Sequence, residues 1–138
     1  DCRMDHVATP VAVNAFYFCD ADGRSDYVQS REPLQVTADT PSLSGFTLRN
    51  VEVSGAGTAA AVFYGLPEAP IRDVVIEDYC VAFDPDAEPQ IAEMASHLPA
   101  LRHAGIVAEN TLFKLLSGLS PASIDPTKND RAHADQLL

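Results

Sequence analysis

The sequence has few basic residues and no long apolar stretch. Only 9 of its 138 residues are Lys or Arg, against 20 that are Asp or Glu, so the formal net charge is −11. The basic residues are scattered singly, and a surface of this sign repels phosphate backbones, so we expect no nucleic-acid partner. No apolar run approaches the roughly 18 residues that a membrane-spanning helix needs, so we expect no membrane partner.

Cysteine is also scarce. Cys2, Cys19 and Cys80 include no CxxC pair and no spacing typical of a metal site, and their odd number argues against a disulfide framework. Free cysteine behaves as a small hydrophobic residue, so we expect three buried free thiols. We predict no metal site and no cofactor.

A short sequence phrase occurs four times in the chain. Each copy has an apolar residue, a charged residue, a turn-prone polar residue and then a β-branched or aromatic residue. The copies occupy residues 4–7, 48–51, 76–79 and 108–111. Repeats with periods of about 20–50 residues are typical of stacked architectures, although a pattern this simple also arises by chance.

The phrase favours two short strands joined by a tight bend, as at the corner of one coil of a parallel β-solenoid. We therefore predict an all-β fold of about four stacked coils. The first position of each copy should form one inward-facing column, made of Met4, Leu48, Ile76 and Ala108. The third position, where left-handed backbone is tolerated, should form a second column at a bend, made of His6, Asn50, Asp78 and Asn110.

The coils should occupy residues 1–116, with strands in the segments 2–19, 46–66, 74–89 and 103–116. Within the first coil, residues 11–18 are apolar enough for a strand that is covered on both faces. Residues 20–42 form a loop excursion, 90–101 a short helix or loop, and 117–138 a loose polar tail. Because the chain starts inside the first copy, we expect an amino-terminal part of a larger protein to precede it. The sequence indicates no compartment.

Two stretches resemble one enzyme family. Residues 9–19 (Thr-Pro-Val-Ala-Val-Asn-Ala-Phe-Tyr-Phe-Cys) and 62–71 (Val-Phe-Tyr-Gly-Leu-Pro-Glu-Ala-Pro-Ile) are similar to the carboxy-terminal coils of glycoside hydrolase family 28. This family contains the polygalacturonases and related pectin-degrading enzymes, and the resemblance covers residues 2–110. It implies a right-handed parallel β-helix and a pectic polysaccharide or oligogalacturonide substrate. It also implies inverting hydrolysis, in which two carboxyl groups roughly 6.5–9.5 Å apart act as acid and base.

The family's catalytic motifs are missing from this sequence. They are Asn-Thr-Asp, a paired Asp-Asp, Gly-His-Gly and Arg-Ile-Lys, all of which lie upstream of these coils in the family, and none occurs here. The resemblance therefore implies that the chain holds no catalytic residue. We expect it to be inactive alone, as the carboxy-terminal part of a larger hydrolase.

One family position is matched by Tyr17, which the resemblance implies to be substrate-binding. A tyrosine ring and hydroxyl suit the apolar face and polar edge of a sugar, although a packed aromatic beside Phe16 and Phe18 fits the sequence equally well. Arg24 and Arg31 would face a carboxylated sugar if the excursion folds over a cleft, but a solvated loop is the favoured interpretation.

The remaining polar residues favour structural roles. We expect His6 to serve the turn, His97 and His103 to be surface histidines, and Glu68 to cap or brace the next coil. The acidic residues between two prolines should form a solvated turn, at Asp84, Asp86 and Glu88.

Two other classes of protein fit the sequence. One is a non-catalytic β-solenoid that binds carbohydrate or forms a structural stalk, and the other is a small globular β-rich domain in which the repeat is accidental. If the coils are severed from upstream neighbours, the first coil exposes strand edges and apolar interior. We then expect self-association through the amino-terminal coil.

Overall fold

The computed structural model describes residues 1–16, 18–91 and 99–120, and these ranges contain seven strands and no α-helix. The strands are β1 (Cys2–Asp5), β2 (Ala12–Asn14), β3 (Thr47–Ala56), β4 (Ala59–Tyr64), β5 (Ile71–Phe83), β6 (Ala104–Glu109) and β7 (Thr111–Leu119). One 3₁₀ turn, η1 (Asp22–Arg24), lies between β2 and β3. The predicted all-β class is confirmed. No helix among the described residues is long and apolar enough to cross a membrane.

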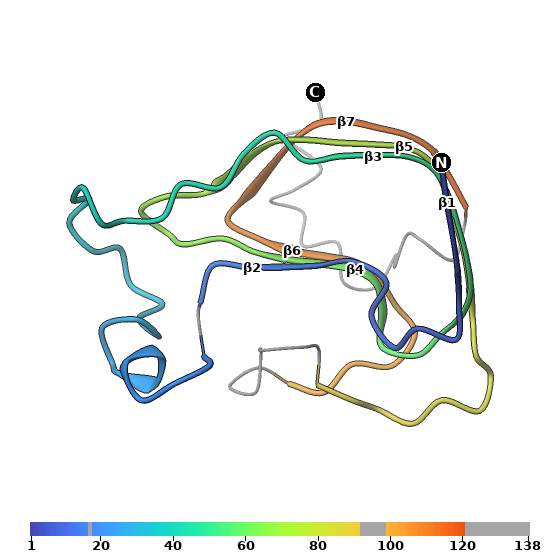
Figure 1. The fold of residues 1–138 in the computed structure, drawn as a ribbon, viewed down its shortest axis with the longest axis horizontal. Helices are drawn as coiled ribbons and strands as arrows, with labels where there is room; N and C mark the ends of the chain where they lie inside the picture. Colours follow the sequence, from blue (N-terminus) through green and yellow to red (C-terminus); the bar gives the residue numbers. More distant parts are fainter. Residues whose placement is uncertain (17, 92–98, 121–138) are drawn as a thin grey trace.

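The chain alternates between two parallel sheets. Sheet A has the strand order β1-β3-β5-β7, and sheet B has the order β2-β4-β6 (Figure 1). Parallel neighbours cannot be joined by a tight hairpin and need a crossover. Here each crossover between neighbours in one sheet carries a strand of the other sheet. Each coil of the chain therefore adds one strand to sheet A and one strand to sheet B.

Sheet A turns a corner, and left-handed residues lie where it turns (Figure 1). Asn50 has φ 52° and Asp78 has φ 51°, and they lie side by side, because their neighbours Arg49 and Glu77 are paired in register. Gly118, with φ 60°, continues the row on β7. A left-handed residue redirects the strand while the ladder continues on both sides of it. The predicted left-handed backbone is confirmed at all four third positions, since His6 has φ 51° and Asn110 has φ 45°.

The four copies do not form one column. Leu48 pairs with Ile76 as predicted, and Leu116 on β7 continues that row. The prediction is wrong for Met4, which pairs with Val53, and for Ala108, which pairs with Phe63 in sheet B. The reason is that the first copy is shifted along β3, and the fourth copy is the corner between β6 and β7. All four first-position side chains nevertheless pack into the same core.

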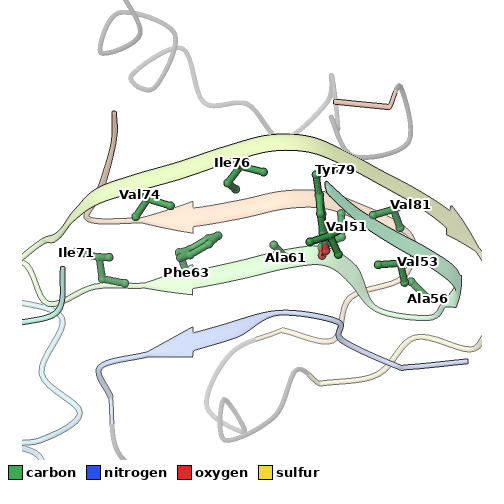
Figure 2. Packing of buried hydrophobic residues seen from close by; sticks show 11 residues of the cluster. Val51, Val53, Ala56, Ala61, Phe63, Ile71, Val74, Ile76, Tyr79 and Val81 are labelled. Carbon is green, nitrogen blue, oxygen red and sulfur yellow. The ribbon is translucent and has the colours of Figure 1, made fainter. Parts of the chain in front are cut away.

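The main core lies between the two sheets (Figure 2). Alternate residues of β5 point inward, so Val74 and Ile76 are fully buried and face the side chain of Phe63 on β4. The buried hydroxyl of Tyr79 donates a hydrogen bond to the carbonyl oxygen of Ala60 and so joins sheet A to sheet B. Burial raises the pKa of Tyr79, because the phenolate is disfavoured away from water.

A second cluster covers the outer face of sheet B. Every residue of β4 is buried, because Val62 and Tyr64 pack outward against Phe16 and Leu101. The strand predicted at 11–18 ends earlier, at Asn14. Its side-chain oxygen accepts a hydrogen bond from the backbone N–H of Phe16 at 2.9 Å, and such a local bond competes with the ladder.

Three further predictions concern the cysteines, the end of the last coil and the segment 90–101. All three cysteines are exposed, so the prediction of buried thiols is wrong. Cys80 lies between the buried Tyr79 and Val81, and alternation on a strand turns it to the solvent side. The boundary at 116 is also wrong, since β7 continues to Leu119. In the segment 90–101, Gln90 and Leu101 form an antiparallel bridge, and residues 92–98 and 121–138 lie outside the described residues.

Candidate functional site

The carboxyl ends of β2, β4 and β6 meet at one edge of sheet B. Asn14, Tyr64 and Glu109 are in register and form a row across the three strands. In-register neighbours of a parallel sheet present their side chains on the same face. Tyr64 packs into the outer cluster, so this row belongs to the outer face. We call the row, together with Phe16 and Arg31, the edge cluster.

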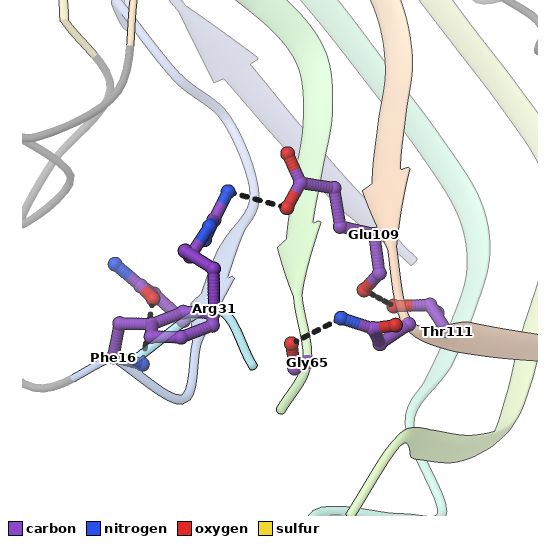
Figure 3. A network of polar contacts seen from close by, with 7 residues as sticks. Phe16, Arg31, Gly65, Glu109 and Thr111 are labelled. Carbon is purple, nitrogen blue, oxygen red and sulfur yellow. Dashed lines mark hydrogen bonds and ion pairs between the residues drawn. The ribbon is translucent and has the colours of Figure 1, made fainter. Parts of the chain in front are cut away.

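The excursion 20–42 returns to the edge cluster through Arg31 (Figure 3). Its Nη2 donates to Oε2 of Glu109 at 2.5 Å, although the two residues are 78 positions apart. The guanidinium carbon also lies 4.6 Å from the centroid of the Phe16 ring, within the range of a cation–π contact. A solvated loop was the favoured prediction, and Arg31 is indeed exposed, but it also contacts a charge on one side and a ring on the other.

Burial differs sharply within the edge cluster. Phe16 is completely buried, whereas the side chains of Arg31 and Glu109 are 38% and 41% exposed. The ring therefore supports the ion pair from below, and the charged groups remain accessible from solvent. The buried ring is not available to a ligand, whereas the accessible ion pair is suited to a ligand that carries charge.

The Tyr64 hydroxyl remains a neutral group in this environment. Burial raises the pKa of Tyr64, and the negative charge of Glu109 raises it further, while Arg31 acts in the opposite direction. A neutral hydroxyl both donates and accepts hydrogen bonds, whereas a phenolate only accepts them. Tyr64 was not predicted as a site residue, although it lies in the stretch 62–71 that carries the family resemblance.

The corner after β6 is built around a close approach of two backbones. Asn110 donates from Nδ2 to the carbonyl oxygen of Gly65 at 3.1 Å, and the N–H of Gly65 donates to the carbonyl of Glu109 at 2.9 Å (Figure 3). A Cβ at Gly65 would overlap the backbone of Asn110. Glycine at this position is therefore required to bring Glu109 to the edge of the sheet.

Arg24 makes a similar ring contact with Phe18. Its guanidinium carbon lies 5.6 Å from the ring centroid of Phe18. The two cations of the excursion thus lie on the two aromatic residues that flank position 17. Tyr17, the predicted substrate-binding residue, lies outside the described residues.

Glu68 does not show the bracing contact that was predicted for it. Its Oε2 is buried and has no hydrogen-bond partner among the described residues. His6 is at a corner as predicted, and its Nδ1 lies 3.0 Å from Oδ2 of Asp5. The hydrogen bond to Asp5 raises the pKa of His6.

The other candidates are structural. His103 is half-buried rather than a surface residue, since its ring stacks on Phe83 at 5.1 Å and its Nε2 lies 2.6 Å from the carbonyl oxygen of Asp84. The solvated turn is confirmed where Oδ1 of Asp84 accepts from the N–H of Asp86 at 2.9 Å. His97 lies outside the described residues. Within the described ranges, no group of three or more His, Cys, Asp or Glu residues is placed to hold a metal ion.

The chain was compared with known proteins in three ways. A scan against models of protein families finds no match, and searches of curated proteins and of solved structures find no significant one.

Proposed function

We propose that this chain forms the carboxy-terminal coils of a right-handed parallel β-helix of the glycoside hydrolase family 28 type. The alternation between two parallel sheets supports this fold, as do the left-handed residues at the turns. In such a fold each coil rests on its neighbour, and the residues at the turns stack.

One observation carries the family assignment. The two stretches that resemble the family are far apart in the sequence but are neighbours in space, since Ala12 pairs with Val62 and Asn14 pairs with Tyr64. Both stretches contribute residues to the edge cluster, Asn14 and Phe16 from the first and Tyr64 from the second. A resemblance by chance gives no reason for two separate segments to meet at one accessible edge.

The chain would contribute contacts to substrate rather than the acid and base. Inverting hydrolysis needs one carboxylic acid and one carboxylate across the glycosidic bond. The edge cluster contains a single carboxyl group, that of Glu109, and it is paired with Arg31, so the cluster does not supply the two groups that the reaction needs. The groups that perform the chemistry then belong to coils upstream of Asp1, and the parent protein is a pectin-degrading hydrolase.

The test is an assay of reducing-end release from polygalacturonate. The isolated chain should release none, and the same chain joined to its natural upstream sequence should hydrolyse the polymer. That upstream sequence should contain Asp-Asp and Gly-His-Gly. Turnover by the isolated chain that disappears when Glu109 is changed to Gln would contradict the proposal. An upstream sequence without these motifs would instead indicate a non-catalytic carbohydrate-binding solenoid.

A further inference from the structure

We propose that Arg31 recognises a carboxylate of an acidic sugar ligand, and that Glu109 occupies this position when no ligand is bound. The choice of an acidic sugar rests on the proposed function. The assignment of Arg31 rests on the geometry of the edge cluster.

The guanidinium of Arg31 is held in place without using all of its donors. Arginine carries five N–H donors in a planar fork. Among the described residues its hydrogen-bond partner is Glu109, reached from Nη2. The contact of the guanidinium carbon with the Phe16 ring, at 4.6 Å from its centroid, is a second contact that does not involve Glu109. A second carboxylate can therefore approach a group that is already positioned.

The ion pair with Glu109 is suited to exchange. Both side chains are about 40% exposed, and ion pairs in such positions contribute little because water screens them. A ligand carboxylate would replace one charge-assisted hydrogen bond by another of the same kind, so the exchange itself costs little. Exposure also gives the ligand direct access to the guanidinium.

Because the whole chain is negatively charged, an acidic ligand needs a local positive charge in order to bind. With a net charge of −11, the protein repels carboxylated sugars in general, so binding needs a local cation. The excursion supplies two, Arg31 over Phe16 and Arg24 over Phe18. By contrast, Arg49 pairs with Glu77 across β3 and β5 on the outside of sheet A, and it has no aromatic contact within the part of the chain that the structure describes.

The experiment measures binding of trigalacturonate and of neutral galactotriose to the 138-residue chain by isothermal titration calorimetry. Arg31→Ala should weaken trigalacturonate binding about tenfold or more, the loss of a hydrogen bond between charged groups. Glu109→Gln should tighten it about two- to fivefold, because the competing charge is gone. Neither change should alter the binding of galactotriose. The matched variants Arg49→Ala and Glu77→Gln should alter neither sugar.

Three results would overturn the inference. Equal affinity of the wild-type and Arg31→Ala chains for trigalacturonate would exclude Arg31 from recognition and leave the proposed function standing. Weaker binding by Glu109→Gln would mean that Glu109 contacts the ligand rather than competing with it. No binding of trigalacturonate by the wild-type chain would also overturn it, while the upstream motifs decide the proposed function separately. If Arg31→Ala fails to fold, Arg31→Lys keeps the charge and loses the fork, and it should weaken trigalacturonate binding alone.

Discussion

Each non-glycine residue with positive φ in the described ranges is Asn, Asp or His. They are His6, Asn50, Asp73, Asp78, His103 and Asn110. These residue types are enriched several-fold in the left-handed region, because their short polar side chains compensate locally for the strain. The sequence thus places a tolerant residue at every point where the backbone needs one.

The contact between His6 and Asp5 can be tested by titrating His6. The hydrogen bond and charge of Asp5 raise the pKa of His6, with a weaker contribution from Asp84. A raised pKa favours the folded state below the ordinary histidine value of about 6.5, and this benefit is lost as the pH rises through the pKa of folded His6. In an NMR titration, Asp5→Asn should lower the pKa of His6, and the control Asp84→Asn should lower it less. Equal shifts in the two variants would contradict the contact with Asp5.

At the scale of single residues, prediction succeeded where the type of one residue was enough to indicate its backbone conformation. The four polar third positions were predicted as left-handed from their types alone. Asp73 was missed because it lies outside the repeated phrase, and it accompanies Gly45, since the adjacent Ser44 and Arg72 form a bridge. Burial of the cysteines was predicted wrongly because it depends on which face of a strand each one occupies.

At the scale of an element, the row of Asn50, Asp78 and Gly118 decides where sheet A turns. Gly118 is packed so closely that a Cβ there would overlap the Asp78 side chain. Gly45 also has positive φ, 78°, but has open space around it. A side chain at Gly45 would therefore cause backbone strain alone, whereas a side chain at Gly118 would cause strain and steric overlap.

Substitution by alanine should reveal both costs. Gly45→Ala should lower the free energy of unfolding by about 1 kcal/mol through backbone strain alone. Gly118→Ala should lower it by about 2–4 kcal/mol, because crowding adds to the strain. Urea denaturation followed by circular dichroism measures both. Equal losses would show that the row at the bend tolerates a side chain on β7.

Element-scale prediction was limited by register. The strands of the second and third copies pair as expected, but the third member of the row is the segment Leu116 to Leu119, where glycine occupies the third position. A search for a polar residue at the third position of the phrase does not find the segment 116–119, because that position is Gly118. The edge cluster was predictable only in part, since residues 62–71 carried the resemblance. No sequence signal connects Arg31 with Glu109, because their contact depends on how a long loop returns to the sheet.

At the scale of the whole molecule, both sheets end in strands with one edge that pairs with no other described strand. β1 and β2 lie at one end of the stack, and the partly buried Met4, Val11 and Val13 complete the core there. Exposed edges with apolar neighbours pair readily with other chains.

We therefore expect the isolated chain to self-associate through the β1 and β2 edge as its concentration rises. Ala12 is exposed on β2, and a charge at that edge should oppose pairing, so Ala12→Lys should reduce the association. Ser117→Lys on β7, at the opposite end, is the control and should change it less. Sedimentation velocity gives the measurement. A monodisperse wild-type monomer with a cooperative melt would favour a self-contained binding domain.

Two tyrosines, Tyr79 and Tyr64, can report on the packing of the two faces of sheet B by their near-ultraviolet signal. The sequence has no Trp and four Tyr, so tyrosine dominates its near-ultraviolet signal. Tyr79 lies in the core between the sheets, and Tyr64 lies in the cluster on the outer face of sheet B. Near-ultraviolet circular dichroism depends on fixed packing around such rings. Replacing Tyr79 by phenylalanine thus removes the tyrosine signal of the core between the sheets, and replacing Tyr64 removes that of the outer cluster.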